Sequence, residues 1–183
     1  DEGIFYGGDH PEWPNTALHR LARRHLGHAR RCVLVDLHTG IGPYGQPFMI
    51  NLDPPGTYGR ERALAVWGAQ ALSGKGSTHT ALATFRGLLT DAFAVALGDC
   101  AVSATAVEFG THERRRMQRA HLANAWMRRQ TRDSEALRRA QAEYRDAFIP
   151  VDPVWRASVI GAGVALCRRG CEALLIDANA AMD

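Results

Sequence analysis

The stretch Cys32-Val33-Leu34-Val35-Asp36-Leu37-His38-Thr39-Gly40-Ile41-Gly42-Pro43 contributes most to the predicted architecture. Residues 32–37 are apolar and partly β-branched, as expected of a strand that is buried on both faces of a parallel sheet. The glycines and the proline that follow predict an abrupt end to this strand. We therefore expect an α/β fold with His38 at the carboxyl end of a strand, where open α/β sheets bind their ligands.

His38 and its neighbour Asp36 each have two interpretations at this stage. His38 can face a ligand, or it can be a structural histidine that caps a turn. Asp36 lies two residues earlier and so shares a face of the strand with His38. It can orient the imidazole ring, or it can accept hydrogen bonds from backbone N–H groups.

A second predicted strand, residues 101–109, also ends on an ionisable group. The period of two places Val102, Ala104, Ala106 and Glu108 on one face, so a carboxylate closes an otherwise apolar row. A buried carboxylate without a partner would cost several kcal/mol, so Glu108 must be neutralised, paired or close to a metal. The alternative is a structural ion pair with one of the many arginines.

Several short motifs, taken in order, resemble one protein family. They are Gly3-Ile4-Phe5-Tyr6-Gly7-Gly8, then Pro11, Trp13 and Asn15, then residues 36–43, and finally Glu108-Phe109-Gly110-Thr111. The set resembles a bacterial family of zinc-carboxypeptidase-like domains of unknown function, related to the succinylglutamate desuccinylase and aspartoacylase group. This resemblance implies that His38 is the third zinc ligand and that Glu108 is the carboxylate that activates the zinc-bound water.

The implied function is hydrolysis of an amide bond in a small peptide or an acylated amino acid. Zinc would polarise the carbonyl group, and Glu108 would take a proton from water and pass it to the leaving amine. Tyr44 and Arg60 are candidates for substrate contact from loops that follow the strands. One alternative is a non-catalytic binding module that kept the fold without the metal site, and a weaker one is a basic nucleic-acid-binding domain.

The chain departs from this family in its zinc ligands. Such enzymes take two more ligands from a His-x-x-Glu motif upstream, but His10-Pro11-Glu12 has one residue too few between its ends. Catalytic zinc needs three protein ligands and an open position for water. We therefore expect residues 1–183 to be one α/β domain that forms the carboxyl-terminal part of a larger catalytic domain, or a shortened relative.

Composition excludes several other classes of protein. The 183 residues are 46% hydrophobic and 22% charged, which is ordinary for a globular domain. A net charge of +3 is too balanced to indicate a polyanion, so the arginines at 114–116, 119, 128, 129 and 132 are expected to form a solvated helix face. No nucleic-acid or membrane partner is expected, and the cytoplasm is the default location.

The rest of the sequence predicts alternating helices and strands. Helices are expected at about 15–30, 60–72, 86–97, 112–130, 133–147 and 153–169, with a short strand at 48–52. The central sheet should be mostly parallel and flanked by helices. Gly74-Lys75-Gly76-Ser77 is similar to a phosphate-binding loop, but glycine follows the lysine where serine or threonine should stand.

Overall fold

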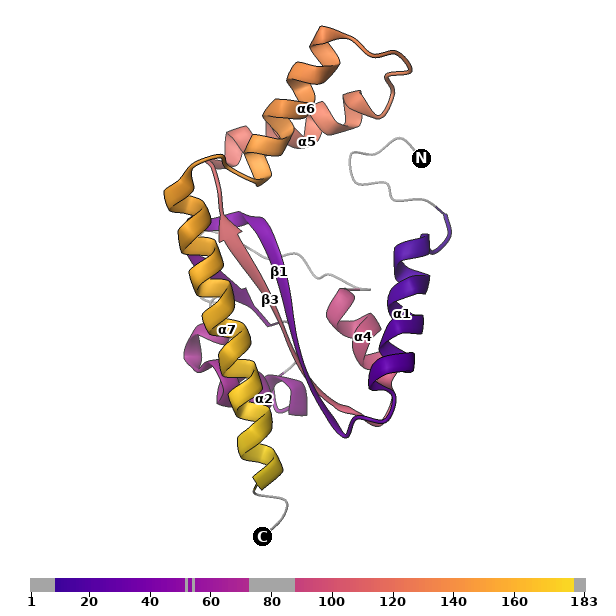
Figure 1. Cartoon of the computed structure of the whole chain (residues 1–183), viewed down its shortest axis with the longest axis vertical. Helices are drawn as coiled ribbons and strands as arrows, with labels where there is room; N and C mark the ends of the chain where they lie inside the picture. Colours follow the sequence, from indigo (N-terminus) through magenta and orange to yellow (C-terminus); the bar gives the residue numbers. More distant parts are fainter. Residues whose placement is uncertain (1–8, 52, 54, 73–87, 180–183) are drawn as a thin grey trace.

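A computed structural model of the chain describes residues 9–51, 53, 55–72 and 88–179. The Gly74–Ser77 loop and the first motif of the resemblance, residues 3–8, lie outside these residues. Figure 1 shows a small sheet with helices on both faces and a helical hairpin beyond one end of the sheet. The predicted α/β class is therefore confirmed for the described part of the chain.

The elements follow one another in the order that the sequence predicts. They are α1 (Trp13–Leu26), β1 (Arg31–Tyr44), β2 (Pro47–Ile50), α2 (Tyr58–Trp67), the 3-10 helix η1 (Ala69–Leu72), α4 (Leu89–Leu97), β3 (Ala101–Gly110), α5 (Arg114–Met127), α6 (Glu135–Phe148) and α7 (Pro153–Asn179). Most boundaries lie within a few residues of the expected ones. The exceptions are β1 and α7, which are longer than predicted.

The central sheet is more mixed in strand direction than predicted. Its three described strands have the order β1-β3-β2, with β1 parallel to β3 and β2 antiparallel to β3. The expectation of a mostly parallel sheet is therefore correct for one strand pair only. The difference arises because β2 follows β1 after the short turn at Gly45 and Gln46, and such a short connection cannot lead into a parallel strand.

Strand β1 does not stop at its glycines, contrary to the sequence prediction. It runs from Arg31 to Tyr44, and its pairing with β3 shifts between Gly40 and Tyr44. Gly42 has a φ of 106°, and a Cβ atom there would lie only 2.9 Å from the Cβ of Phe48. The glycines therefore bend the strand instead of ending it, and His38 lies six residues before its last residue.

Helices cover the two faces of the sheet unequally. On one face, α2, η1 and α7 enclose a core that includes Trp67, Val107, Phe109, Trp155 and Leu166. On the other face, α1 and α4 form a smaller cluster around Phe93 and Leu97, with Cys32, Leu34 and Val102 packed against it. Residues 102, 104, 106 and 108 of β3, which include Glu108, are only half-buried, whereas Ser103, Thr105, Val107 and Phe109 are buried.

The α5–α6 hairpin lies beyond the carboxyl ends of β1 and β3 (Figure 1). Its own small core contains Met117, Ala120 and Ala147, with Tyr144 and Phe148 packed against them. The base of the hairpin packs on β1, because a Cβ atom at Gly40 would lie 3.4 Å from Met117 and 3.6 Å from Phe148. None of the described helices is long and apolar enough to cross a membrane.

Candidate functional site at the end of the parallel strands

His38 and Glu108 are direct partners across the parallel pair of β1 and β3. Neighbouring strands lie about 4.8 Å apart, and residues in register point to the same side of a sheet. Both side chains therefore lie on the face that α1 and α4 cover, close to the edge from which the α5–α6 hairpin extends. The structure brings together the two residues that the sequence places at the ends of separate strands.

Asp36 contacts His38 directly. The Asp36 Oδ2 atom lies 2.7 Å from Nε2 of His38, which is the distance of a strong hydrogen bond. The Asp36 side chain is only 15% exposed, whereas that of His38 is 47% exposed. Asp36 thus holds one nitrogen of a solvent-accessible ring, and in a neutral imidazole the other nitrogen, Nδ1, carries the free lone pair.

Glu108 is half-buried, and its pKa is raised. Burial raises the pKa of its carboxyl group, and a smaller opposing effect comes from His38. The backbone N–H of Ile41 donates a hydrogen bond of 3.4 Å to Glu108 Oε2. The side-chain charges that shift this pKa are those of His38 and Asp36, and no arginine of the described residues contributes to the shift. The site therefore differs from the arginine pair that the sequence offered as the alternative.

The first residues of α7 fix the turn that follows β1. The Trp155 Nε1–H donates a 2.8 Å hydrogen bond to the carbonyl of Gly110, which also accepts a 2.8 Å bond from the N–H of Gly45. Ser158 Oγ donates to the carbonyl of Gly45, also at 2.8 Å. These bonds tie the end of β3, two residues after Glu108, to the turn and to the helix.

Tyr44 belongs to the same anchor. Its hydroxyl group donates a 2.9 Å hydrogen bond to Asp152 Oδ2, and Asp152 Oδ1 accepts a bond of the same length from the N–H of Val154. Asp152 therefore caps the start of α7, and these hydrogen bonds lower the pKa of its carboxyl group. In this structure Tyr44 holds the turn in place, so its proposed contact with substrate would need a different orientation.

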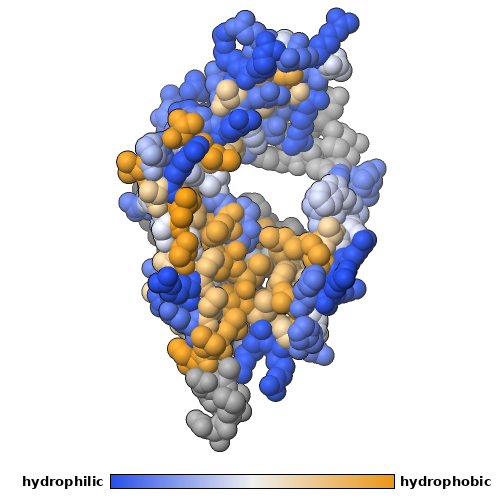
Figure 2. Space-filling view, in the orientation of Figure 1, coloured by the Kyte–Doolittle hydropathy of each residue, from blue (hydrophilic) through white to orange (hydrophobic). Residues whose placement is uncertain are grey.

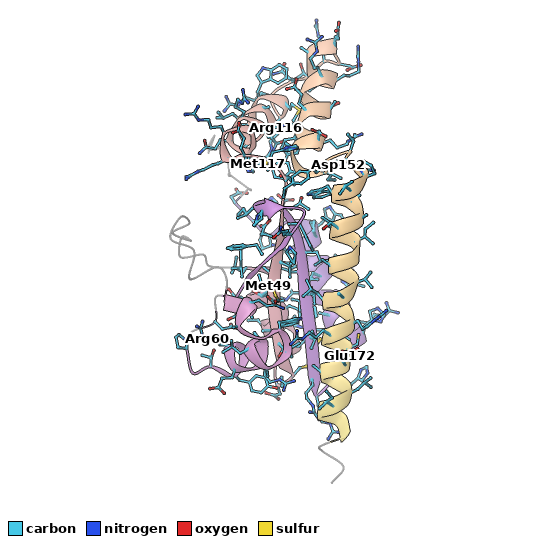
Figure 3. The ribbon with its side chains drawn as sticks, turned by 90° about the vertical axis from the view of Figure 1, so that its left-hand side faces the viewer. Met49, Arg60, Arg116, Met117, Asp152 and Glu172 are labelled. Atoms are coloured by element: carbon cyan, nitrogen blue, oxygen red, sulfur yellow. The ribbon has the colours of Figure 1, made fainter. Side chains whose placement is uncertain are left out.

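Arg60 lies apart from His38 and Glu108. It is on α2, and its Nη1 atom donates a 3.4 Å hydrogen bond to the backbone carbonyl of Asp53. Asp53 is linked through Asn51 to the carbonyl of Ala104, near the middle of β3. Figure 3 shows Arg60 well below Met117, which packs at the other end of the sheet.

A polar cluster next to the site was not predicted from the sequence. His112 follows β3, and its Nε2 atom lies 3.1 Å from the carbonyl oxygen of Asp146, while its Nδ1 atom lies 3.3 Å from Arg116. Arg116 also pairs with the Asp146 carboxylate. The His112 ring lies 6.2 Å from that of Tyr44. His112 and Arg116 are four residues apart, but Asp146 and Tyr44 come from distant segments, so no local spacing indicates the whole cluster.

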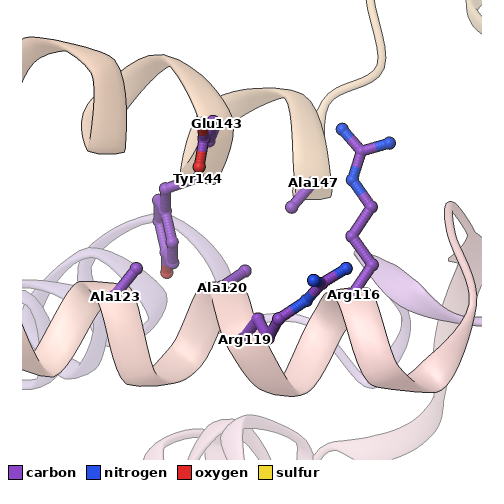
Figure 4. A pocket seen from close by; sticks show the side chains of 7 residues that line it. All are labelled: Arg116, Arg119, Ala120, Ala123, Glu143, Tyr144 and Ala147. Atoms are coloured by element: carbon purple, nitrogen blue, oxygen red, sulfur yellow. The ribbon is translucent and has the colours of Figure 1, made fainter.

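A cavity of about 470 Å³ lies between α5 and α6 (Figure 4). Its lining residues are Arg116, Arg119, Ala120, Ala123, Glu143, Tyr144 and Ala147. His38, Asp36 and Glu108 do not line this cavity. The alanines open this space between the helices, and Arg116 is already paired with Asp146 at its rim.

Zinc needs more ligands than this edge of the sheet supplies. Within residues 9–51, 53, 55–72 and 88–179, no group of three histidine, cysteine or acidic side chains is placed to hold a metal ion. His38 is a suitable single ligand, since its Nδ1 is free when Asp36 holds Nε2. The described residues therefore do not fit a complete catalytic zinc site.

Comparison with known proteins identifies a family for this chain. The family model described as "Protein of unknown function (DUF2817)" matches residues 1–162. No curated protein and no solved structure matches the chain. The family description names no activity, and it makes no link to carboxypeptidases. Because the match covers most of the 183 residues, the chain belongs to the DUF2817 family.

Proposed function

We propose that the edge formed by β1 and β3 is part of the catalytic site of a hydrolase that cleaves amide bonds. The observation that carries this proposal is the register of His38 with Glu108 on adjacent parallel strands. A third group, Asp36, holds the histidine ring. Acid–base sites typically join a titratable group of altered acidity to a second group of fixed orientation, and this edge has both.

Glu108 is the proton carrier in this proposal. Its carboxylate would accept a proton from the attacking water and then deliver this proton to the nitrogen of the leaving amine. Burial raises the pKa of Glu108, so its carboxylate is a stronger base near neutral pH than that of an exposed glutamate. The hydrogen bond from Ile41 N–H limits the orientations of Glu108.

His38 is the zinc ligand in this proposal. The remaining ligands would have to come from polypeptide outside the described residues, as the resemblance to zinc carboxypeptidases implies. When bound, zinc would supply Lewis-acid activation of the scissile carbonyl. The substrate would be a small peptide or an acylated amino acid, and the chemistry calls for no nucleic acid or membrane.

A second candidate function is a binding module without catalysis. It is supported by the lack of a three-ligand group in the described part of the chain. In that case His38 and Glu108 would contact a ligand without turning it over. The two functions differ in what happens when the chain is extended upstream to include a His-x-x-Glu motif.

Calorimetric zinc titration distinguishes these candidates. We expect the 183-residue chain to bind zinc weakly or not at all, because one histidine is a poor site at neutral pH. An upstream-extended chain should bind zinc tightly and lose that binding on His38→Ala. His121→Ala, on α5, is the matched control. Tight, His38-dependent binding by the 183-residue chain would show that the ligand set is already complete.

Turnover of acylated amino acids by the zinc-loaded extended chain tests the role of Glu108. Glu108→Gln should preserve zinc binding and lower the turnover rate by at least about 10²-fold, because the proton carrier is lost while shape is kept. Glu172→Gln, at an exposed position of α7, should have no effect. If the Glu108→Gln variant hydrolyses substrate at the parental rate, Glu108 has no part in the mechanism.

A further inference from the structure

The cavity between α5 and α6 combines an apolar floor with charges of both signs. Its α5 side consists of residues 116, 119, 120 and 123, which have the i, i+3, i+4, i+7 spacing of one helix face. Ala120 and Ala147 are buried, and the Tyr144 side chain points from α6 toward α5 (Figure 4). Because three of the seven lining residues are alanines, the helices leave a hollow of about 470 Å³ here instead of a filled core.

We propose that this cavity binds a free amino acid with an apolar side chain, whose carboxylate pairs with Arg119 and whose ammonium group pairs with Glu143. The proposal does not depend on the proposed function, because His38, Asp36 and Glu108 do not line the cavity. It rests on the two opposite charges that face the same space, on the pairing of the other charges of the hairpin, and on the size and apolar floor of the cavity.

Opposite charges elsewhere on the hairpin pair directly. These pairs are Arg116 with Asp146, Arg138 with Asp133, and Arg139 with Glu135. Arg119 and Glu143, which the structure also describes, line one cavity from opposite helices but form no ion pair with each other, so their charged atoms lie more than 4.0 Å apart. A zwitterion bridges such a gap, whereas an ion of one sign pairs with only one of the two groups.

Arg119 suits a carboxylate better than Arg116 does. The guanidinium group of Arg116 is held by the Asp146 carboxylate and lies 3.3 Å from Nδ1 of His112. Arg119 is exposed, and no ion pair or side-chain hydrogen bond joins it to another described residue. Its planar guanidinium group can therefore turn toward a ligand and bind both oxygens of a carboxylate.

The size and floor of the cavity select a small apolar ligand. Small-molecule pockets have volumes of about 300–1,000 Å³, and the volume of about 470 Å³ lies near the lower end of that range. The alanine methyl groups and the Tyr144 ring offer apolar surface to one aliphatic side chain. Leucine should therefore bind at least about tenfold more tightly than glycine, which leaves this surface uncovered.

An NMR titration of the chain with ¹³C-labelled alanine methyl groups tests this site without reference to activity. L-leucine should shift the signals of Ala120, Ala123 and Ala147 in a saturable way. The signal of Ala63, which is buried on α2, should stay unchanged and is the internal control. Repeating the titration with glycine tests the contribution of the apolar floor.

Analogues with one charge test the two ends of the ligand. N-acetyl-L-leucine lacks the ammonium group, and L-leucinamide lacks the carboxylate. Each should bind at least about tenfold more weakly than L-leucine, because one charge-assisted hydrogen bond is lost. Glu143→Gln should remove the preference for L-leucine over N-acetyl-L-leucine, and Arg119→Gln should remove the preference over L-leucinamide. Arg115→Gln, at an exposed position of α5 outside the cavity, is the matched control and should change neither preference.

Several results would overturn the proposal. One is a set of cavity methyl signals that L-leucine leaves in place, and another is an equal shift of the Ala63 signal. Equal affinities for L-leucine and its two analogues would show that the charges of Arg119 and Glu143 do not read the ligand. The upstream-extended chain should respond as the 183-residue chain does. Loss of the response there would show that polypeptide occupies the cavity, and would equally overturn the proposal.

Discussion

Trp155→Phe tests how strongly the start of α7 anchors the end of β3. Trp155 is 4% exposed, and its indole N–H donates a 2.8 Å hydrogen bond to the carbonyl of Gly110. Phenylalanine keeps most of the ring but has no donor. The Gly110 carbonyl still accepts a bond from Gly45 N–H, so it is not left without a partner.

The expected loss of stability follows from these contacts. Loss of the hydrogen bond should lower the free energy of unfolding by about 1 kcal/mol. This is near the low end for a buried hydrogen bond, because the Gly110 carbonyl still accepts the bond from Gly45 N–H. The space left by the smaller ring should cost about 1–2 kcal/mol more. The sum of about 2–3 kcal/mol corresponds to a fall in Tm of roughly 4–12 °C for a chain of this length.

Thermal unfolding followed by circular dichroism measures this effect. Trp13→Phe is the matched control, because Trp13 is 77% exposed and its replacement should change stability by less than about 0.5 kcal/mol. Equal Tm values for the two variants would refute the reasoning that α7 anchors the end of β3. A fall well above about 12 °C would indicate that the indole supports more of the fold than this single bond.

Two other predictions concern stability. Gly110→Ala should prevent folding or strongly destabilise the chain, because a Cβ atom there would lie 2.0 Å from the carbonyl oxygen of Gly42. The control is Gly161→Ala, whose Cβ atom meets nothing within 4 Å, and thermal unfolding should show that it is neutral or slightly stabilising. Burial raises the pKa of Glu108, so the stability that this group contributes is full below the ordinary carboxyl pKa and is lost as the pH rises through the raised value. Urea unfolding should therefore show that Glu108→Gln gains stability relative to the parent chain between about pH 4 and pH 7. The gain should be at most about 1.4 kcal/mol for each tenfold change in the proton affinity of Glu108, and solvent screening reduces it. A stability difference that stays constant with pH would contradict the raised pKa.

Local sequence signals were sufficient for the order of the elements and for the placement of His38 and Glu108 on two parallel strands, but not for their pairing in register. The apolar run before His38 and the alternating row before Glu108 each predict a strand, and both strands are present and parallel. The period of two also predicts that Asp36 and His38 share a face, in agreement with their 2.7 Å contact. These features depend on residues close together in the sequence.

Long-range packing explains what the sequence did not predict. The glycines at 40 and 42 predict a strand end, but pairing with β3 continues past them with a shifted register. Trp155 contacts Gly110, which lies 45 positions earlier, and Asp152 contacts Tyr44, which lies 108 positions earlier. No local pattern therefore shows that Trp155 and Asp152 anchor the site. The antiparallel placement of β2 likewise follows from the turn that joins it to β1 and not from its own four residues.

The central claim is that His38 and Glu108 belong to one acid–base site, and an NMR titration of the Glu108 carboxyl carbon tests it most directly. The account predicts a pKa for Glu108 above the ordinary value of a glutamate side chain. It also predicts a further rise of this pKa in His38→Ala, because the charge that opposes the effect of burial is removed. A Glu108 pKa in the ordinary range, or one that His38→Ala leaves unchanged, would contradict the claim that the two residues act together.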